Sequence, residues 1–94
     1  MEATHSALIP VAQGNEDIEV IALIDVLRRG GLNVVVASVD NQELVGLMQG
    51  TRLVVDAAFE SVANQHWDVI ALPGGIPGAM NLAESVLLRE RLQS

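Results

Sequence analysis

The sequence contains no cysteine, and this absence excludes a disulfide framework, a thiolate metal site and thiol catalysis by these residues themselves. Basic residues are also few: there are 5 against 12 acids, and the net charge is -7. Because so little positive charge is available to neutralise phosphates, the composition argues against binding to nucleic acid or to an anionic membrane surface. Small molecules and other proteins remain as partners.

Long apolar runs are missing as well. The longest uncharged stretch, residues 69–83, is interrupted by two prolines and three glycines, so no transmembrane segment is predicted. The amino-terminal sequence MEATHSALIPVA carries an acid rather than the basic start of a signal peptide, which favours a soluble, cytosolic protein. Half of the 94 residues are apolar, enough for one small core, so the chain is a single domain or a piece of one.

The apolar segments alternate between strand and helix patterns. Residues 6–11 form a strand-length apolar run, and Asn15 is expected to cap the helix that follows over residues 16–29. This helix is apolar on almost all sides, so we expect the sheet and a second subunit to cover it. The further elements expected are a buried strand at 33–38, a hairpin of 44–48 with 51–55, a short helix at 57–65, a strand at 68–72 and a helix at 78–92.

This order predicts an α/β fold, a doubly wound and mostly parallel sheet with helices on both faces. Residues 14–19 and 73–78 would both lie at the carboxyl edge of the sheet, and they are expected to be neighbours although roughly 60 residues separate them. The last helix has no strand after it. We therefore expect residues 1–94 to be the amino-terminal half of one domain, with the remainder on another polypeptide or missing.

The turn LPGG at residues 72–75 carries the first candidate site residues. Gly74 and Gly75 allow backbone conformations closed to other residues, so successive N–H groups can point into one pocket and stabilise an oxyanion. The alternative is a strand-to-helix turn that needs glycines for its shape alone. The segment lacks both the G-x-G-x-x-G and the G-x-x-x-x-G-K patterns, so no dinucleotide, ATP or other cofactor is expected.

Glu19 is the second candidate. Acids are favoured in the first turn of a helix by the helix dipole alone, which is the plain explanation for this residue. However, Glu19 precedes the apolar run VIALI, and a carboxyl group buried against such a surface would favour its protonated form, which suits a proton donor.

The two histidines do not indicate a metal site. His5 lies in the amino-terminal tail and His66 in a loop, without ligands at metal-binding spacing, so a solvated or structural role is expected and no metal is assigned. Arg28 and Arg29 complement the carboxyl end of their helix; a subunit contact is the alternative role.

Three motifs occur together in this sequence: G-x-E-[ED]-x-E at residues 14–19, D-x-L-R-R-G-G at 25–31 and D-V-I-x-L-P-G-G at 68–75. With the segments 7–38, 53–62 and 67–85 around them, they resemble the amino-terminal half of the ThiJ/PfpI superfamily, most of all its Parkinson-disease protein deglycase branch. The resemblance implies a flavodoxin-like sandwich that dimerises around the first helix.

The resemblance also implies roles for individual residues. Glu19 matches the glutamate that hydrogen-bonds a nucleophilic cysteine, and Gly75, with Gly74 beside it, matches the oxyanion-hole glycine. The cysteine itself would lie just beyond residue 94, with an assisting histidine further on, so this chain alone should be inert. The implied activity is that of a glyoxalase or protein deglycase acting on methylglyoxal or its adducts.

Three alternatives to this enzyme remain. The family fold can serve as a chaperone-like or oxidative-stress binding module, or as a protease-type member of the superfamily. A truncated product without function would expose its last helix and its sheet edge, and it should be poorly soluble.

Overall fold

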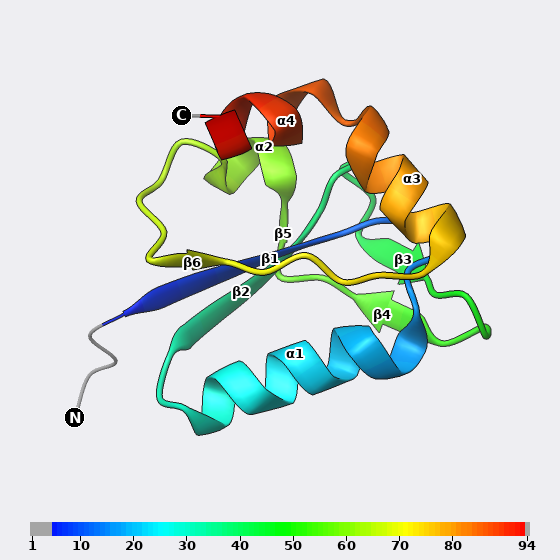
Figure 1. Cartoon of the computed structure of the whole chain (residues 1–94), viewed down its shortest axis with the longest axis horizontal. Coiled ribbons are helices and arrows are strands. Elements are labelled where there is room, and N and C mark those ends of the chain that lie inside the picture. The colour runs from blue at the N-terminus through cyan, green and yellow to red at the C-terminus, as the bar shows by residue number, and fades with distance from the viewer. Residues whose placement is uncertain (1–4, 94) are drawn as a thin grey trace.

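The structure is a computed structural model, and it describes residues 5–93. Strands and helices follow one another in the order that the sequence predicts, with one short strand added before the second helix and the last predicted helix divided into two (Figure 1). The elements are β1 (Ser6–Val11), α1 (Asp17–Arg29), β2 (Asn33–Ser38), β3 (Leu44–Gly46), β4 (Arg52–Val54), β5 (Ala57–Ala58), α2 (Phe59–Val62), β6 (Val69–Ile70), α3 (Ile76–Glu84) and α4 (Val86–Gln93).

Four of the strands form one parallel sheet in the order β5-β2-β1-β6, which confirms the predicted parallel α/β fold. β1 and β2 pair along their whole length, from Ser6 opposite Asn33 to Val11 opposite Ser38. β3 and β4 form the predicted antiparallel hairpin beside this sheet. The added strand, β5, has only two residues, too few for a periodic pattern in the sequence.

Helices cover both faces of the sheet (Figure 1). Successive residues of a strand point to opposite faces, so β1 contributes to two cores. Leu8 packs with residues of α2, α3 and α4 on one face, whereas Ala7 and Ile9 pack with α1 and the hairpin on the other. All three of these residues are 0% exposed. Because both faces of β1 are buried, its sequence is a continuous apolar run.

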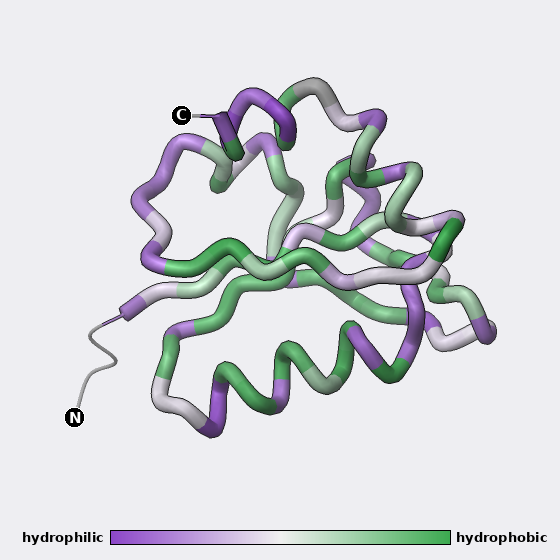
Figure 2. The backbone as a smooth tube through the Cα atoms, viewed as in Figure 1, coloured by the Kyte–Doolittle hydropathy of each residue, from purple (hydrophilic) through white to green (hydrophobic). Residues whose placement is uncertain are grey.

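Helix α1 begins after Glu16, not after Asn15 as predicted. The Glu16 carboxylate accepts a hydrogen bond from the Glu19 N–H at 2.8 Å and so performs the capping role itself. The sheet covers one side of the helix, but no described residue covers the other: Ile18 is 75% and Val26 63% exposed. Figure 2 shows that most of the length of α1 is hydrophobic. The cover expected on a second side is therefore not provided by residues 5–93.

The predicted helix at 78–92 is wrong in its extent, because α3 and α4 are separate. Ser85 between them has a non-helical backbone, with φ -72° and ψ 110°. Its hydroxyl accepts a hydrogen bond from the Leu88 N–H at 3.2 Å, as at the start of a new helix.

In the part of the chain that the structure describes, no helix has the length and apolar character needed to cross a membrane.

Candidate active site

The two loops that the sequence predicts to be neighbours meet at the carboxyl edge of the sheet. The N–H of Glu16 donates a hydrogen bond to the carbonyl oxygen of Gly74 at 2.9 Å. The carboxylate of Glu19 lies directly over Gly74: a Cβ atom built on that glycine would be 3.0 Å from Oε1 and 3.1 Å from Oε2. The parallel pairing of β1 with β6 produces this contact, because it brings the carboxyl ends of both strands to one place.

Glu19 is exposed in the described chain, so the burial expected from the sequence is not present. Next to its carboxylate, however, is a depression of about 300 Å³ with mostly apolar walls. The depression is lined by Glu19, Ala22, Leu23, Val26, Leu72 and Pro73. A group seated there would bury the carboxylate against apolar surface, which the described residues do not do alone.

Position 75 must be occupied by a residue without a side chain, which is Gly75. Its φ is 96°, a region that L-residues rarely adopt, and a Cβ there would lie 2.6 Å from the backbone nitrogen of Glu16. Gly75 also directly precedes α3, whose first turn contains Pro77. Among residues 5–93, neither the Gly74 N–H nor the Gly75 N–H donates a hydrogen bond. Both donors are therefore free to receive an external acceptor.

Asn15 is a site residue whose importance the sequence interpretation missed. Its side chain is 0% exposed, and its Oδ1 accepts a hydrogen bond from the Ala12 N–H at 2.7 Å. Its Nδ2 donates to the carbonyl oxygens of Pro73 at 3.3 Å and Gly74 at 3.0 Å. The sequence shows a polar residue before a helix, which is typical of a cap, and carries no signal of a partner 58 residues away.

A third loop, the turn of the β3-β4 hairpin, is attached to the start of α1. The carboxylate of Asp17 accepts hydrogen bonds from the N–H groups of Gln49 at 2.8 Å and Thr51 at 3.2 Å. The hydrogen bond to the Thr51 side chain, followed by those two N–H groups, holds the pKa of Asp17 below its ordinary value against the opposing effect of desolvation. The backbone carbonyl of Asn15 also accepts a hydrogen bond from the Met48 N–H at 2.8 Å. Asn15 therefore contacts both the hairpin turn and the Gly74 loop of the candidate site.

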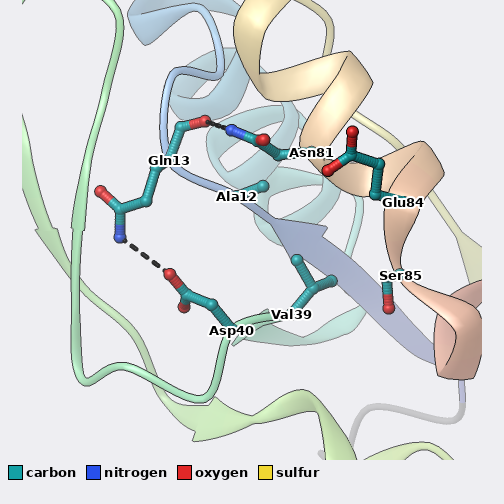
Figure 3. Close-up of a pocket in the computed structure, with 7 residues that line it drawn as sticks. All are labelled: Ala12, Gln13, Val39, Asp40, Asn81, Glu84 and Ser85. Carbon is teal, nitrogen blue, oxygen red and sulfur yellow. Dashed lines mark hydrogen bonds between the residues drawn. The ribbon is translucent and has the colours of Figure 1, made fainter.

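A separate cavity of about 290 Å³ lies where β1 and β2 end, beside α3 (Figure 3). Gln13 forms the polar side of this cavity. Its side-chain Nε2 donates a hydrogen bond to Asp40 at 3.2 Å, and its backbone carbonyl accepts one from the Asn81 side chain at 2.7 Å. The Gln13 Oε1 accepts from the N–H of Gly46 at 2.7 Å. The cavity is lined by Ala12, Gln13, Val39, Asp40, Asn81, Glu84 and Ser85 and includes none of the predicted site residues.

The histidines lie at the other end of the sheet, by the start of β6. The sequence analysis expected a solvated or structural role for them, and the structure gives both the same partner: His66 Nε2 is 3.0 Å from Asp68 Oδ1, and His5 Nδ1 is 3.6 Å from Asp68 Oδ2. The N–H of Ser6 and then His66 hold the pKa of Asp68 below its ordinary value. Within residues 5–93 there is no group of three or more His, Cys, Asp or Glu arranged to hold a metal ion.

The two arginines at the end of α1 face different partners. Arg29 Nε lies 3.0 Å from Asp25 one turn earlier, and Arg28 approaches Asp56 to 3.9 Å. Both pairs are exposed, so each contributes little to stability.

The fold and the site together define a class: a doubly wound α/β domain in which the first helix presents a carboxylate to a diglycine loop after the neighbouring strand. The chain belongs to the DJ-1/PfpI family, whose sequence profile matches residues 5–94. The resemblance drawn from the three sequence motifs is thereby confirmed.

Individual relatives agree with this assignment. The Caenorhabditis elegans protein named glutathione-independent glyoxalase DJR-1.2 is 43% identical over 95 residues, which cover 100% of this chain and 50% of that protein. Protein DJ-1 homolog B of Arabidopsis thaliana is 46% identical over 80 residues, 85% of this chain and 18% of the relative. The solved structure of oxidized Toxoplasma gondii DJ-1 superimposes with a TM-score of 0.93 at 41% identity and covers 96% of this chain and 49% of its own. The chain thus spans half or less of each of these proteins.

Proposed function

We propose that this chain is the amino-terminal half of a cysteine-dependent glyoxalase or protein deglycase-like enzyme that acts on methylglyoxal or its adducts. In this proposal the chain supplies Glu19 and the loop of Gly74 and Gly75, and a second polypeptide supplies the nucleophile. One observation carries the proposal: the Glu19 carboxylate lies against Gly74, beside two backbone N–H groups that have no acceptor among the described residues. The name of the nematode relative, a glutathione-independent glyoxalase, supports the choice of substrate.

The chemistry requires two kinds of stabilisation at one carbon atom. When a thiolate adds to an aldehyde, a carbon–sulfur bond forms and the electron pair of the C=O bond moves to the oxygen. The free N–H groups of Gly74 and Gly75 are suited to stabilise that oxyanion, since amide donors held in place need no reorganisation. A carboxyl group at Glu19 can hydrogen-bond the sulfur or transfer a proton between sulfur and oxygen. Both groups come from this chain; the sulfur does not.

The surface beside the site supports a further strand, from the remaining half of the domain, as the source of the sulfur. Within residues 5–93, β6 pairs with β1 on one side and with no strand on the other. An apolar groove of about 280 Å³ lies between the segment that follows β6 and the last two helices, α3 and α4. The groove is lined by Leu72, Pro73, Ala79, Leu82, Ala83, Leu88, Arg89 and Leu92. A strand added at β6 would place its carboxyl end beside Leu72 and Pro73, which also line the depression next to Glu19.

The experiment combines this chain with the remaining half of the nematode relative, which the family resemblance predicts to carry the cysteine. We expect consumption of methylglyoxal with formation of lactate, and loss of both when the thiol is alkylated. The chain has no lysine and no cysteine, so its own side-chain reaction with the aldehyde is confined to 5 arginines and gives a low background. Absence of turnover with the thiol free would refute the enzyme and favour the chaperone-like or stress-response binding module.

A matched pair of variants tests the role of Glu19. Glu19→Gln removes the ionisable group and should lower kcat about 10²-fold or more, in the range of general acid–base catalysis. Glu60→Gln makes the same change at an exposed position in the first turn of α2, remote from the loop, and should leave kcat unchanged. Equal rates in the two variants would remove Glu19 from the mechanism.

We also propose that the complete domain forms a homodimer through α1. The outer side of this helix presents Ile18 and Val26, 75% and 63% exposed, together with Ile21 at 47%. Apolar side chains gathered on one side of a helix are typical of a subunit contact.

A further inference from the structure

The buried carboxamide of Asn15 divides its hydrogen bonds between two different parts of the molecule. Its oxygen closes the local turn through the Ala12 N–H. Its nitrogen donates to two consecutive carbonyl groups of the remote diglycine loop, those of Pro73 and Gly74. The Gly74 carbonyl also accepts from the Glu16 N–H at 2.9 Å, so two donors hold it from the same side.

Because peptides are planar, these hydrogen bonds also fix the directions of two N–H groups, those of Gly74 and Gly75. In a planar trans peptide, the C=O and the N–H of the following residue point in opposite directions. Because the Pro73 carbonyl points toward Asn15, the Gly74 N–H must point away from it. For the same reason the Gly75 N–H must point away, and neither N–H has an acceptor among residues 5–93.

We infer that Asn15 is a positioning residue for the proposed oxyanion-stabilising loop, since it sets the direction of the Gly74 and Gly75 N–H groups. This inference rests on the proposed function. An asparagine needed only for the turn would use its oxygen and leave its nitrogen in solvent, whereas here the residue is buried and both hydrogen bonds of its nitrogen go to the loop. Asn15 is also closely packed against the start of α3, because a side chain at position 78 would collide with it.

Variants can test the roles of the carboxamide oxygen and the carboxamide nitrogen of Asn15 separately. Asn15→Asp keeps the size and the oxygen that accepts from Ala12, but it replaces the donor with an acceptor that faces two carbonyl oxygens. Asn15→Ala removes the donor without adding a charge, in case the aspartate variant does not fold. Asn64→Asp, at an exposed position in the loop after α2, is the matched control for the added charge.

The first readout is nuclear magnetic resonance on the isotopically labelled chain and does not depend on activity. We expect a coupling across the hydrogen bond from the Asn15 side-chain nitrogen to the Gly74 carbonyl carbon. In both Asn15 variants the Gly74 and Gly75 amide signals should shift or split, while those of β2 stay in place. Unchanged Gly74 and Gly75 signals in the variants would overturn the inference.

The second readout is activity of the chain combined with the cysteine-bearing half. Misdirected N–H groups should lower kcat about 10²-fold with little change in KM, because the lost stabilisation acts on the transition state. A variant that melts earlier but retains full kcat would show a merely structural role and overturn the inference. If the unmutated combination shows no turnover, the proposed function fails, and the resonance experiment alone still decides whether Asn15 orients the loop.

Discussion

Gly75→Ala is the perturbation that tests most directly how closely the two site loops are packed. Gly75 has φ 96°, and an added Cβ would lie 2.6 Å from the Glu16 nitrogen and 3.1 Å from the Gly14 carbonyl oxygen. These are backbone atoms and cannot rotate away. Gly50 in the hairpin turn provides a matched control, since it has the same φ of 96° but no atom within 4 Å of an added Cβ.

The expected magnitudes follow from this difference. An L-residue in the left-handed region costs about 1–2 kcal/mol, and alanine recovers about 0.4–1 kcal/mol through the lower entropy of its unfolded state. Gly50→Ala should therefore reduce the free energy of unfolding by about 1 kcal/mol. Gly75→Ala carries a backbone cost at least as large, because its ψ of 125° lies outside the left-handed α region. In addition, it costs about 1–3 kcal/mol for forcing the loops apart.

The assay is urea unfolding of both variants, followed by the fluorescence of Trp67. This residue is the single tryptophan of the chain and is 8% exposed, so it reports loss of the core on the face of α2, α3 and α4. With a denaturant dependence of about 1–3 kcal/mol per molar urea, the two midpoints should differ by roughly 1 M. Coincident midpoints would show that the loops separate at no cost and would refute the close packing described for this site.

Two further predictions concern the surroundings of the site. The pKa of Asp17 is lowered in the folded state, so the stability that its carboxylate contributes is present above the unfolded pKa and is lost as pH falls through the folded one. Asp17→Asn should therefore flatten the fall in melting temperature below about pH 4, and a slope equal to that of the unmodified chain would contradict this role. Ile18→Asp, at a side chain that is 75% exposed, should leave the melting temperature within about 2 °C but weaken self-association of the complete domain in sedimentation experiments. Unchanged self-association would argue against a dimer contact at α1.

Prediction from the sequence succeeded where a local pattern determines the structure. β1 and β2 have the predicted bounds, because strands buried on both faces need unbroken apolar runs. It failed where a single side chain chose between two local structures. Ser85 interrupts a continuous helical pattern by capping a new helix, and periodicity alone cannot detect such a choice. The shortness of β6 was also missed, since within the described residues this strand pairs only with β1.

The sequence by itself determined the α/β class, the family motifs and the two segments that meet at the candidate site, because these depend on periodicity and on the shared edge of a parallel sheet. Only the tertiary structure decided that Glu19 is exposed, that its carboxylate lies over Gly74 and that Asn15 holds the diglycine loop. The last two of these features are contacts between residues far apart in the sequence; Asn15 and Gly74 are 59 positions apart. Such contacts depend on how the strands are brought together in space, which no local pattern in the sequence records.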